Sequence, residues 1–315
     1  MKKAVVSIVL LIALLFVVSC GQEGEKAAQE APKAEETVSK VEVIQGVIDE
    51  HFSNISANKN YMVGEKDFVE MVRSGEDMLI LDIRQADAYE AGHVKGAVNV
   101  PWGPAIAKSL EFLPTDKPVM VYCYTGQTAN QTNALLNFIG VDAKSVRFGW
   151  NFGISKVEGV DDVVVTEVAE FAGKSGIEVD PVMRDVFTGY FEGLADVSGT
   201  MYASNIISEE NLKKIVDAQD DNVYILSVRQ EKDYSAGHVQ GAKNIPWGDG
   251  MQNQFGSLPA DKKIVVYCYT GQTAGQTVAG LRVLGYDAVS LRGGMGTPAN
   301  VPQGWSNQGY PVVTE

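Results

Sequence analysis

The chain is poor in cysteine and histidine and has an excess of acidic residues, and each of these features excludes a class of protein. Only 3 cysteines and 3 histidines occur among its 315 residues, which argues against a disulfide scaffold and against a metal site, and no cofactor is expected. Basic residues number 26 against 40 acidic ones, a formal net charge of −14. This balance argues against a nucleic-acid partner.

One long apolar run stands out, from Ala4 to Val18, directly after Lys2 and Lys3. It is too short to span a membrane comfortably and is typical of the hydrophobic region of a signal peptide. We therefore predict a signal peptide over residues 1–19 and export of the chain.

The end of this run, Val17-Val18-Ser19-Cys20, resembles a bacterial lipobox. Cys20 is accordingly the predicted lipidation site, and the alternative is a cysteine buried at the end of a membrane helix. Residues 20–40 then form the lipidated cysteine and a flexible tether, because they are rich in Ala, Glu, Lys and Gln and lack aromatic side chains. We expect a lipid anchor in a bacterial membrane, facing the periplasm or the cell exterior.

The remaining sequence is a duplication. Adding 145 to a position takes His93 to His238, and 13 of 20 positions are identical between Arg84–Gly103 and Arg229–Gly248. A chain of this length can form two domains with independent cores. Two equivalent sites are therefore expected.

Upstream of this region the offset between the copies changes to 139, which relates Val47–Phe52 to Val186–Phe191. Each copy is thus predicted to begin with its own helix. We place the two domains at residues 41–165 and 181–315, and the Val163–Val165 run is a candidate last strand of the first.

The most informative repeat is the hexapeptide Cys-Tyr-Thr-Gly-Gln-Thr, found at Cys123–Thr128 and Cys268–Thr273. Each copy follows a β-branched run and precedes a plausible helix, so each cysteine is predicted to begin a short loop between strand and helix. Backbone N–H groups and the positive end of the helix dipole favour a thiolate there. Cys123 and Cys268 are the predicted nucleophiles, and a disulfide between them is not expected because they belong to different domains.

Strand-like and helix-like segments alternate in both copies, which predicts an α/β fold with a parallel sheet flanked by helices in each domain. The expected strands of the first copy are Met78 to Ile83, Val98 to Val100, Val119 to Tyr122 and Lys144 to Arg147. Those of the second are Val223 to Val228, Ile264 to Tyr267 and Ala288 to Leu291. A cysteine at the carboxyl end of a central strand lies where such sheets bind ligands.

Three ordered motifs connect this pattern with a known family. They are Leu-Asp-Ile-Arg at Leu81–Arg84, Ala-Gly-His-Val-Lys-Gly-Ala at Ala91–Ala97, and the Tyr-Cys loop, and all three recur in the second copy. The chain resembles a tandem rhodanese-like protein of the thiosulfate sulfurtransferase family. The resemblance covers about residues 60–155 and 205–315.

What the resemblance implies is a sulfurtransferase that moves sulfane sulfur from thiosulfate or polysulfide to a thiophilic acceptor through persulfides on both cysteines. Small sulfur-containing anions or thiols are the implied substrates. They would bind the loop residues Tyr124, Thr125, Gly126, Gln127, Thr128, Tyr269, Thr270, Gly271, Gln272 and Thr273. Many members carry a cation near the loop end and this chain does not, so a carrier that delivers persulfide sulfur to a partner protein without turnover is the alternative.

Several loop side chains keep two interpretations. Thr128 and Thr273 can donate a hydroxyl to the sulfur, and they can also cap the following helix through the backbone. Tyr124 and Tyr269 are expected at the pocket entrance.

Other residues shared by the copies are expected to stabilise the fold. His93 and His238 lie in Gly-His-Val turns and are predicted to make structural hydrogen bonds. The arginines Arg84 and Arg229 are predicted to form ion pairs with nearby acids. The tryptophans of the two Pro-Trp-Gly segments are predicted to pack against apolar neighbours.

Overall fold

Short runs of apolar and β-branched residues form the strands, and two parallel sheets result. The computed structural model describes residues 39–314, so the predicted signal peptide and Cys20 lie outside the described residues. The first copy contains α1 (Lys40–Ser53), β1 (Met62–Val63), α2 (Glu65–Ser74), β2 (Leu79–Asp82), α3 (Ala86–Glu90), β3 (His93–Val94), β4 (Ala97–Asn99), α4 (Pro104–Lys108), β5 (Val119–Tyr122), α5 (Gln127–Phe138), β6 (Ala143–Val146) and β7 (Val164–Val165).

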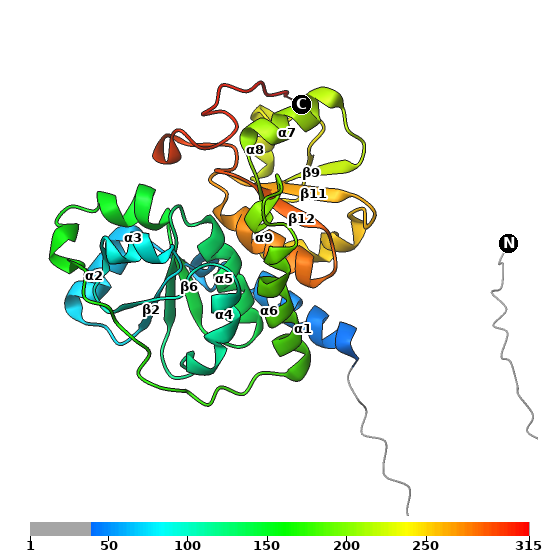
Figure 1. The fold of residues 1–315 in the computed structure, drawn as a ribbon. Helices are drawn as coiled ribbons and strands as arrows, with labels where there is room; N and C mark the ends of the chain where they lie inside the picture. Colours follow the sequence, from blue (N-terminus) through cyan, green and yellow to red (C-terminus); the bar gives the residue numbers. More distant parts are fainter. Residues whose placement is uncertain (1–38, 315) are drawn as a thin grey trace, which may run out of the picture. The chain divides into compact units, whose positions relative to one another are not determined.

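The second copy repeats the five strands of the parallel sheet and most of the helices, but within residues 181–314 it has no strand in place of β3 or β7 and no α-helix in place of α4. It contains α6 (Pro181–Glu192), β8 (Ile206–Ile207), α7 (Glu209–Ala218), β9 (Val223–Ser227), α8 (Glu231–Ala236), β10 (Lys243–Asn244), β11 (Lys263–Tyr267), α9 (Gln272–Val283) and β12 (Ala288–Leu291). The sheets run β1-β6-β5-β2-β4 and β8-β12-β11-β9-β10, which is the same order (Figure 1). The predicted α/β fold with two parallel sheets flanked by helices is confirmed.

The central strand of each sheet ends at a cysteine. β5 is buried at all four positions and pairs in parallel with β2 on one side and β6 on the other. β11 has the same two kinds of neighbour, β9 and β12. Because all these strands run in parallel, the segments that follow them meet at one edge of each sheet.

The helices that follow the cysteines, α5 and α9, pack against each other and join the copies (Figure 1). The buried residues of both helices include amides, and two of these are paired between the helices: Gln276 Nε2 donates to Asn130 Oδ1 at 2.7 Å. An ideal Cβ on Gly275 would lie 2.7 Å from the carbonyl oxygen of Gln127, so glycine is needed for this close approach. Pairing removes most of the cost of burying these amides.

Each of the two initial helices contacts both copies. His51 of α1 lies 3.3 Å from Gln276 of α9, and at the equivalent places the Tyr190 hydroxyl of α6 donates to Gln131 of α5 at 2.6 Å. α1 also packs against the 251–257 segment of the second copy, and α6 against α4 of the first. The predicted initial helices therefore exist, but each contributes to the core of the other copy.

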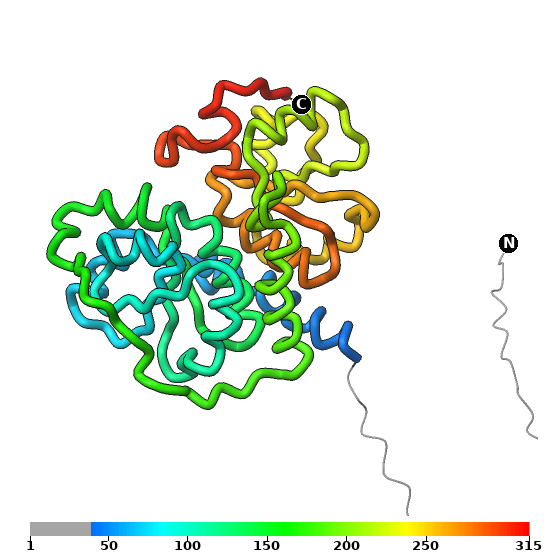
Figure 2. The backbone as a smooth tube through the Cα atoms, viewed as in Figure 1, coloured from blue at the N-terminus to red at the C-terminus, as the bar shows by residue number. Residues whose placement is uncertain are grey.

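The segment between β7 and α6 runs along the first domain before the chain reaches α6 (Figure 2). Phe171 stacks on Phe112 at 5.0 Å, and Ser175 N–H donates to the carbonyl of Glu111 at 2.8 Å. The Val163–Val165 run contributes β7, which pairs antiparallel with β3. These contacts hold the connection against the first copy.

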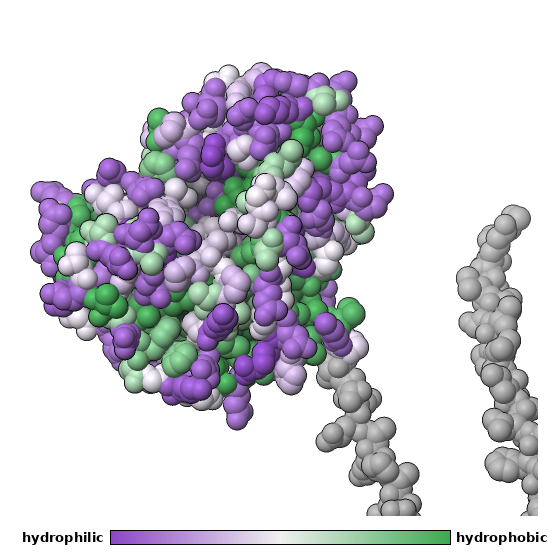
Figure 3. All heavy atoms as spheres, viewed as in Figure 1, coloured by the Kyte–Doolittle hydropathy of each residue, from purple (hydrophilic) through white to green (hydrophobic). Residues whose placement is uncertain are grey.

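Hydrophilic side chains are spread over the visible face, with apolar ones in smaller groups between them (Figure 3). Within residues 39–314, no helix has the length and apolar character needed to cross a bilayer.

His51 makes stability depend on pH. Burial lowers the pKa of His51 to about 4 from an ordinary 6.5, and its Nδ1 has no hydrogen-bond partner. The unfolded chain therefore binds this proton at a higher pH than the folded chain does, and the folded state loses stability as the pH falls from 6.5 towards 4.

Replacing His51 with Tyr, the residue at the equivalent place in the second copy, should remove about 2 kcal/mol of the loss in unfolding free energy between pH 7 and pH 5. Urea unfolding of parent and variant at both pH values measures this difference. Equal losses in the two proteins would contradict it.

Candidate active site

Cys123 and Cys268 lie where the central strands end. Both are free thiols and both are almost fully buried, with 3% and 2% of their surface exposed. Each loop of three residues turns directly into the next helix, α5 or α9. The strand, loop and helix arrangement expected from the sequence is therefore present at both cysteines.

Backbone N–H groups of each loop point at the sulfur. Gly126 N–H donates to Cys123 Sγ at 3.1 Å and Ala129 N–H at 3.4 Å, while Gly271 N–H donates to Cys268 Sγ at 3.1 Å. Gly126 and Gly271 have φ of 86° and 85°, which L side chains rarely adopt. The repeated glycine thus permits the turn that aims these donors.

A second segment packs against the backbone of each loop, and the sequence alone did not indicate it. Gly149 and Gly294, which the offset of 145 also relates, lie directly against the two loops. Trp150 N–H donates to the carbonyl of Cys123 at 2.8 Å, and Met295 N–H donates to that of Cys268 at the same distance. We call residues 147–150 and 292–295 the supporting turns.

Tyr124 and Tyr269 lie on the outer side of the loops. Tyr124 is 38% exposed, and its hydroxyl accepts from Gln85 N–H at 3.2 Å. Tyr269 accepts from Gln230 N–H at 3.2 Å and donates to the Asp233 carboxylate. Burial, together with this hydrogen bond, raises the pKa of Tyr269.

The loop threonines are half-buried. Thr128 and Thr273 lie inside the first turn of α5 and α9, so neither occupies the N-cap position that the capping interpretation requires. Gly126 and Gly271 are the N-cap residues of α5 and α9, without a side-chain capping bond. Across residues 39–314, the hydrogen bonds include none from the hydroxyl of Thr128 or Thr273 to a sulfur. Thr270 Oγ1 accepts from Gln272 Nε2 at 2.9 Å.

The side chains of Gln127 and Gln272 lie between the domains. They are 2% and 4% exposed, and each bonds residues of the other copy. Their backbone positions belong to the loops, as the sequence indicated, but their amide groups face the domain interface.

The shared histidines and tryptophans have structural contacts, as predicted. Nδ1 of His93 lies 2.8 Å from the carbonyl of Tyr89, and Nδ1 of His238 lies 3.0 Å from that of Tyr234. The ring of Trp102 packs edge-on against Phe191 at 5.5 Å, and the ring of Trp247 against Phe52 at 6.0 Å.

The two arginines differ from each other. Arg84 forms the predicted ion pair, at 2.6 Å from Asp82, and stacks over Trp150 at 4.1 Å. Burial opposes the charge of Arg84, but the bonds to Asp82 outweigh it, so its pKa is raised. The ion pair predicted for Arg229 is wrong: Ser227 replaces the aspartate, and Arg229 donates instead to the backbone carbonyls of Gly237 and Asp233.

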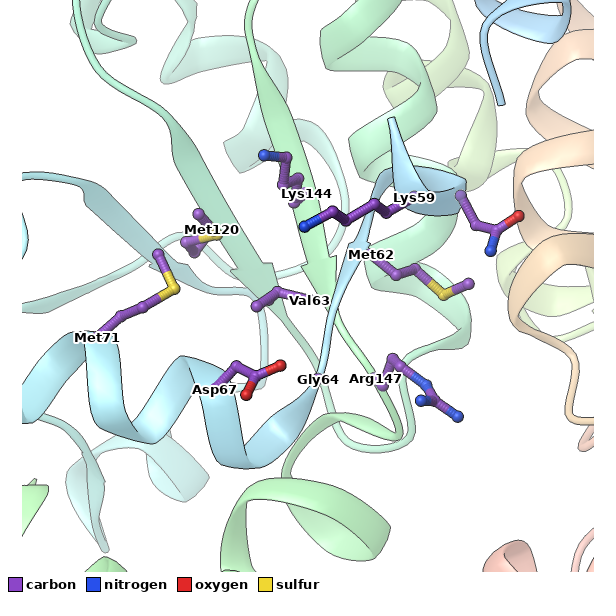
Figure 4. A pocket seen from close by; sticks show the side chains of 10 residues that line it. Lys59, Met62, Val63, Gly64, Asp67, Met71, Met120, Lys144 and Arg147 are labelled. Atoms are coloured by element: carbon purple, nitrogen blue, oxygen red, sulfur yellow. The ribbon is translucent and has the colours of Figure 1, made fainter. Parts of the chain in front are cut away.

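A pocket of about 730 Å³ lies in the first domain beside β1, β6 and α2. The ammonium groups of Lys59 and Lys144 point into it, and the Asp67 carboxylate approaches from α2 (Figure 4). Its lining includes no residue of the Cys123 loop, although Arg147 of the supporting turn contributes to it. The positive charge of this pocket is therefore separate from the sulfur.

The second domain does not repeat this cluster of charges. Near β1 and β8 the copies correspond at an offset of 144, so Ala203 stands in place of Lys59. Val289 stands in place of Lys144 at the offset of 145. The arginine of the second supporting turn, Arg292, pairs with Glu209 at 2.6 Å. Within residues 39–314, no group of three or more His, Cys, Asp or Glu side chains could hold a metal ion.

Comparison with known proteins places this fold and its loops in a class. The family described as "Rhodanese-like domain" matches residues 65–152 and 208–296, more than half of the 315 residues. The chain belongs to the rhodanese family and carries two of its domains in tandem.

Several relatives are sulfurtransferases by name. "Putative thiosulfate sulfurtransferase 2" of Mycobacterium bovis is 24% identical over 67% of this chain and 73% of its own length. "Thiosulfate:glutathione sulfurtransferase" of Saccharomyces cerevisiae is 28% identical over 27% of this chain and 69% of its own length. Other relatives are matched over as little as 38% of their length.

A crystal structure of thiosulfate sulfurtransferase from Pseudomonas aeruginosa aligns with 20% identity and a TM-score of 0.31, over 78% of this chain and 46% of that one. The family and the names of the relatives support sulfur transfer, in general terms, as the chemistry of this protein.

The supporting turn can be tested at Gly149, where φ is 58° and an ideal Cβ would lie 2.4 Å from the carbonyl oxygen of Cys123. Gly149→Ala should cost at least about 2 kcal/mol of unfolding free energy, because it combines strain with overlap. It should also change the alkylation rate of Cys123 by more than that of Cys268, which peptide mass spectrometry after iodoacetamide treatment measures.

Gly140→Ala is the matched control, because Gly140 has φ of 85° and an ideal Cβ on it would have no heavy atom within 4 Å. It should cost about 1 kcal/mol and leave both alkylation rates unchanged. A similar cost for the two substitutions would show that the close approach at Gly149 is unimportant.

Proposed function

We propose that this protein is a sulfurtransferase with two persulfide sites, Cys123 and Cys268. In the first half-reaction the thiolate attacks the sulfane sulfur of thiosulfate or polysulfide. The donor's S–S bond breaks, its remainder leaves with the bonding electrons, and a cysteine persulfide forms. In the second, an acceptor such as cyanide or a thiol attacks the outer sulfur, and the cysteine leaves as thiolate.

The observation that carries this proposal is the set of N–H donors at each sulfur. Gly126 N–H and Gly271 N–H both lie 3.1 Å from the sulfur of their loop. A persulfide is anionic at neutral pH, and fixed N–H dipoles in a nearly buried site stabilise such a charge without reorganisation. The loops Tyr124–Thr128 and Tyr269–Thr273 would provide this environment around the outer sulfur.

The proposed donors are anions that the loop amides attract in place of a charged side chain. The hexapeptides contain no Lys or Arg, in a chain of net charge −14. This composition favours polysulfide or a protein persulfide over thiosulfate as the efficient donor. Thiols are proposed acceptors, in keeping with the name of the yeast relative.

Thiocyanate formation from thiosulfate or polysulfide and cyanide tests the proposal, in the full chain and in its cysteine variants. Cys123→Ser and Cys268→Ser should each remove part of the activity, and the double substitution should abolish it, because each site carries its own nucleophile. An undiminished rate in the double variant would overturn the assignment of both cysteines.

The absence of Lys and Arg from the two hexapeptides also favours a second candidate function, a sulfur carrier that passes its persulfide to a partner protein. A parent with no turnover on cyanide that still gains 32 Da at Cys123 or Cys268 after polysulfide treatment would support the carrier. The mass is that of one added sulfur atom, and peptide mass spectrometry locates it.

We further propose that the chain is exported and held in a bacterial membrane by a lipid on Cys20, facing the periplasm or cell exterior. The support is the charged and apolar start of the sequence and the Val17-Val18-Ser19-Cys20 segment. Tandem sulfur sites on a flexible tether would then act at the membrane surface.

Cys20→Ala should move the protein from the membrane fraction to the soluble fraction, or leave it with an uncleaved signal peptide. Fractionation of cells with immunodetection, and the mass of the amino-terminal peptide, measure the outcome. A mature parent without a lipid mass on Cys20 would contradict the anchor.

A further inference from the structure

Each cysteine loop contains a glutamine whose side chain leaves its own site and enters the other domain. Gln127 and Gln272 occupy the same place in the two hexapeptides, one residue after the glycine that donates to the sulfur. Both are buried in the interface between the domains. Neither side chain bonds the sulfur of its own loop.

Gln127 holds the segment that supports the Cys268 loop. Its Nε2 donates to Ser290 Oγ at 2.7 Å and to the carbonyl of Leu291 at 3.0 Å, and its Oε1 accepts from Gly293 N–H at 3.3 Å. These partners are the end of β12 and the start of the second supporting turn. The next residue, Gly294, lies against the backbone of the Cys268 loop.

Gln127 also limits the position of the donor to Cys268. An ideal Cβ on Gly271 would lie 2.7 Å from Gln127 Oε1, so the amide group fills the space behind this glycine. Gly271 N–H is the group that donates to Cys268 Sγ. One side chain of the first domain thus contacts both the donor glycine and the supporting turn of the second site.

Gln272 makes the reciprocal contacts in the first domain. Its Oε1 accepts from Phe148 N–H at 2.9 Å, in the first supporting turn, and an ideal Cβ on Gly126 would lie 2.9 Å from the same oxygen. Gly126 N–H donates to Cys123 Sγ. The Nε2 of Gln272 differs, because it remains in its own loop and donates to Thr270 Oγ1.

We propose that Gln127 is a positioning residue for Cys268 and Gln272 a positioning residue for Cys123, so that each loop depends on the other domain. The role in sulfur transfer rests on the proposed function, whereas the effect on thiol reactivity does not. Removing the amide of Gln127 leaves Gly293 N–H without its acceptor. Removing that of Gln272 leaves Phe148 N–H without its acceptor. The supporting turn and the donor glycine then shift to recover a partner. The substitution therefore changes the reactivity of the cysteine in the opposite loop.

The test is the pH profile of iodoacetamide alkylation, measured for both cysteines in the same sample of the full chain by peptide mass spectrometry. Gln127→Met keeps the volume and removes the hydrogen bonds. It should move the Cys268 profile to higher pH by about one unit, a tenfold loss of rate below the midpoint, and leave the Cys123 profile in place. Gln272→Met should shift Cys123 more than Cys268.

The matched control is Gln131→Met. Gln131 is also a fully buried glutamine of α5 that crosses the interface, but its partners are the Ser204 carbonyl and the Tyr190 hydroxyl, away from both loops. It should move neither profile. A shift at Cys268 equal to that of Gln127→Met would show that any loss at the interface has this effect, and would overturn the proposal.

A conservative substitution separates positioning from folding. Gln272→Glu keeps an oxygen to accept from Phe148 N–H, so the Cys123 profile should lie closer to the parent than in Gln272→Met. Gln127→Glu loses its donor to the Leu291 carbonyl and should not recover Cys268. If Gln127→Met does not fold, this ordering of the two Gln272 variants decides, and equal profiles in them overturn the proposal.

The sulfur-transfer assay then extends the result. In the Cys123→Ser background, where only Cys268 works, Gln127→Met should lower thiocyanate formation about tenfold. Crosswise shifts of the alkylation profiles with no thiocyanate in the parent would uphold the positioning and refute turnover. A shift at the cysteine of the same loop alone would refute the positioning, whatever the turnover.

Discussion

The two cysteine loops lie back to back because the helix after each of them, α5 or α9, packs against its counterpart in the other copy. This contact brings the polar residues that begin the helices into a buried interface, where every amide needs a partner. Gln276 finds Asn130, and Gln127 finds the end of β12. The sites are therefore built from both domains, although each loop belongs to one.

The repeat, the parallel sheets and the place of the cysteines could be predicted from the sequence, because strand periodicity and a constant offset of 145 report local structure. The direction of the Gln127 side chain could not, since a polar residue in a loop suggests solvent or substrate and only the partner helix buries it. Gly149 and Gly294 obey the same offset, but a lone shared glycine gives no signal of contact with a loop 26 residues earlier. The contacts of α1 and α6 with the opposite copies could not be predicted either, because they join segments far apart in the sequence.

The two identical loops have different neighbours in the two domains. In the first domain, Asp82 forms an ion pair with Arg84, and Trp150 covers the guanidinium. In the second domain, Ser227 and Met295 stand at those places, Arg229 Nε has no hydrogen-bond partner, and the guanidinium lies 5.3 Å from the centre of the Tyr269 ring. The ion-pair prediction for Arg229 was wrong because it rested on acids nearby in the sequence. In the structure, the Asp233 carboxylate accepts a hydrogen bond from the Tyr269 hydroxyl instead. The two arginines consequently have different electrostatic surroundings.

The contacts of α1 and α6 with the opposite copies give the chain the internal symmetry of a dimer whose two subunits have been joined end to end. His51 with Gln276 and Tyr190 with Gln131 are one contact seen twice, as in an isologous interface. A half cut out of this chain would keep its own initial helix but lose the contacts of that helix with the other copy. Apolar side chains such as Phe52 or Phe191, which pack against a tryptophan of the other copy, would then be exposed to water. The smallest unit that can keep its core is therefore the pair of copies. Because the connection between β7 and α6 joins them in one chain, the two copies are always present in equal numbers.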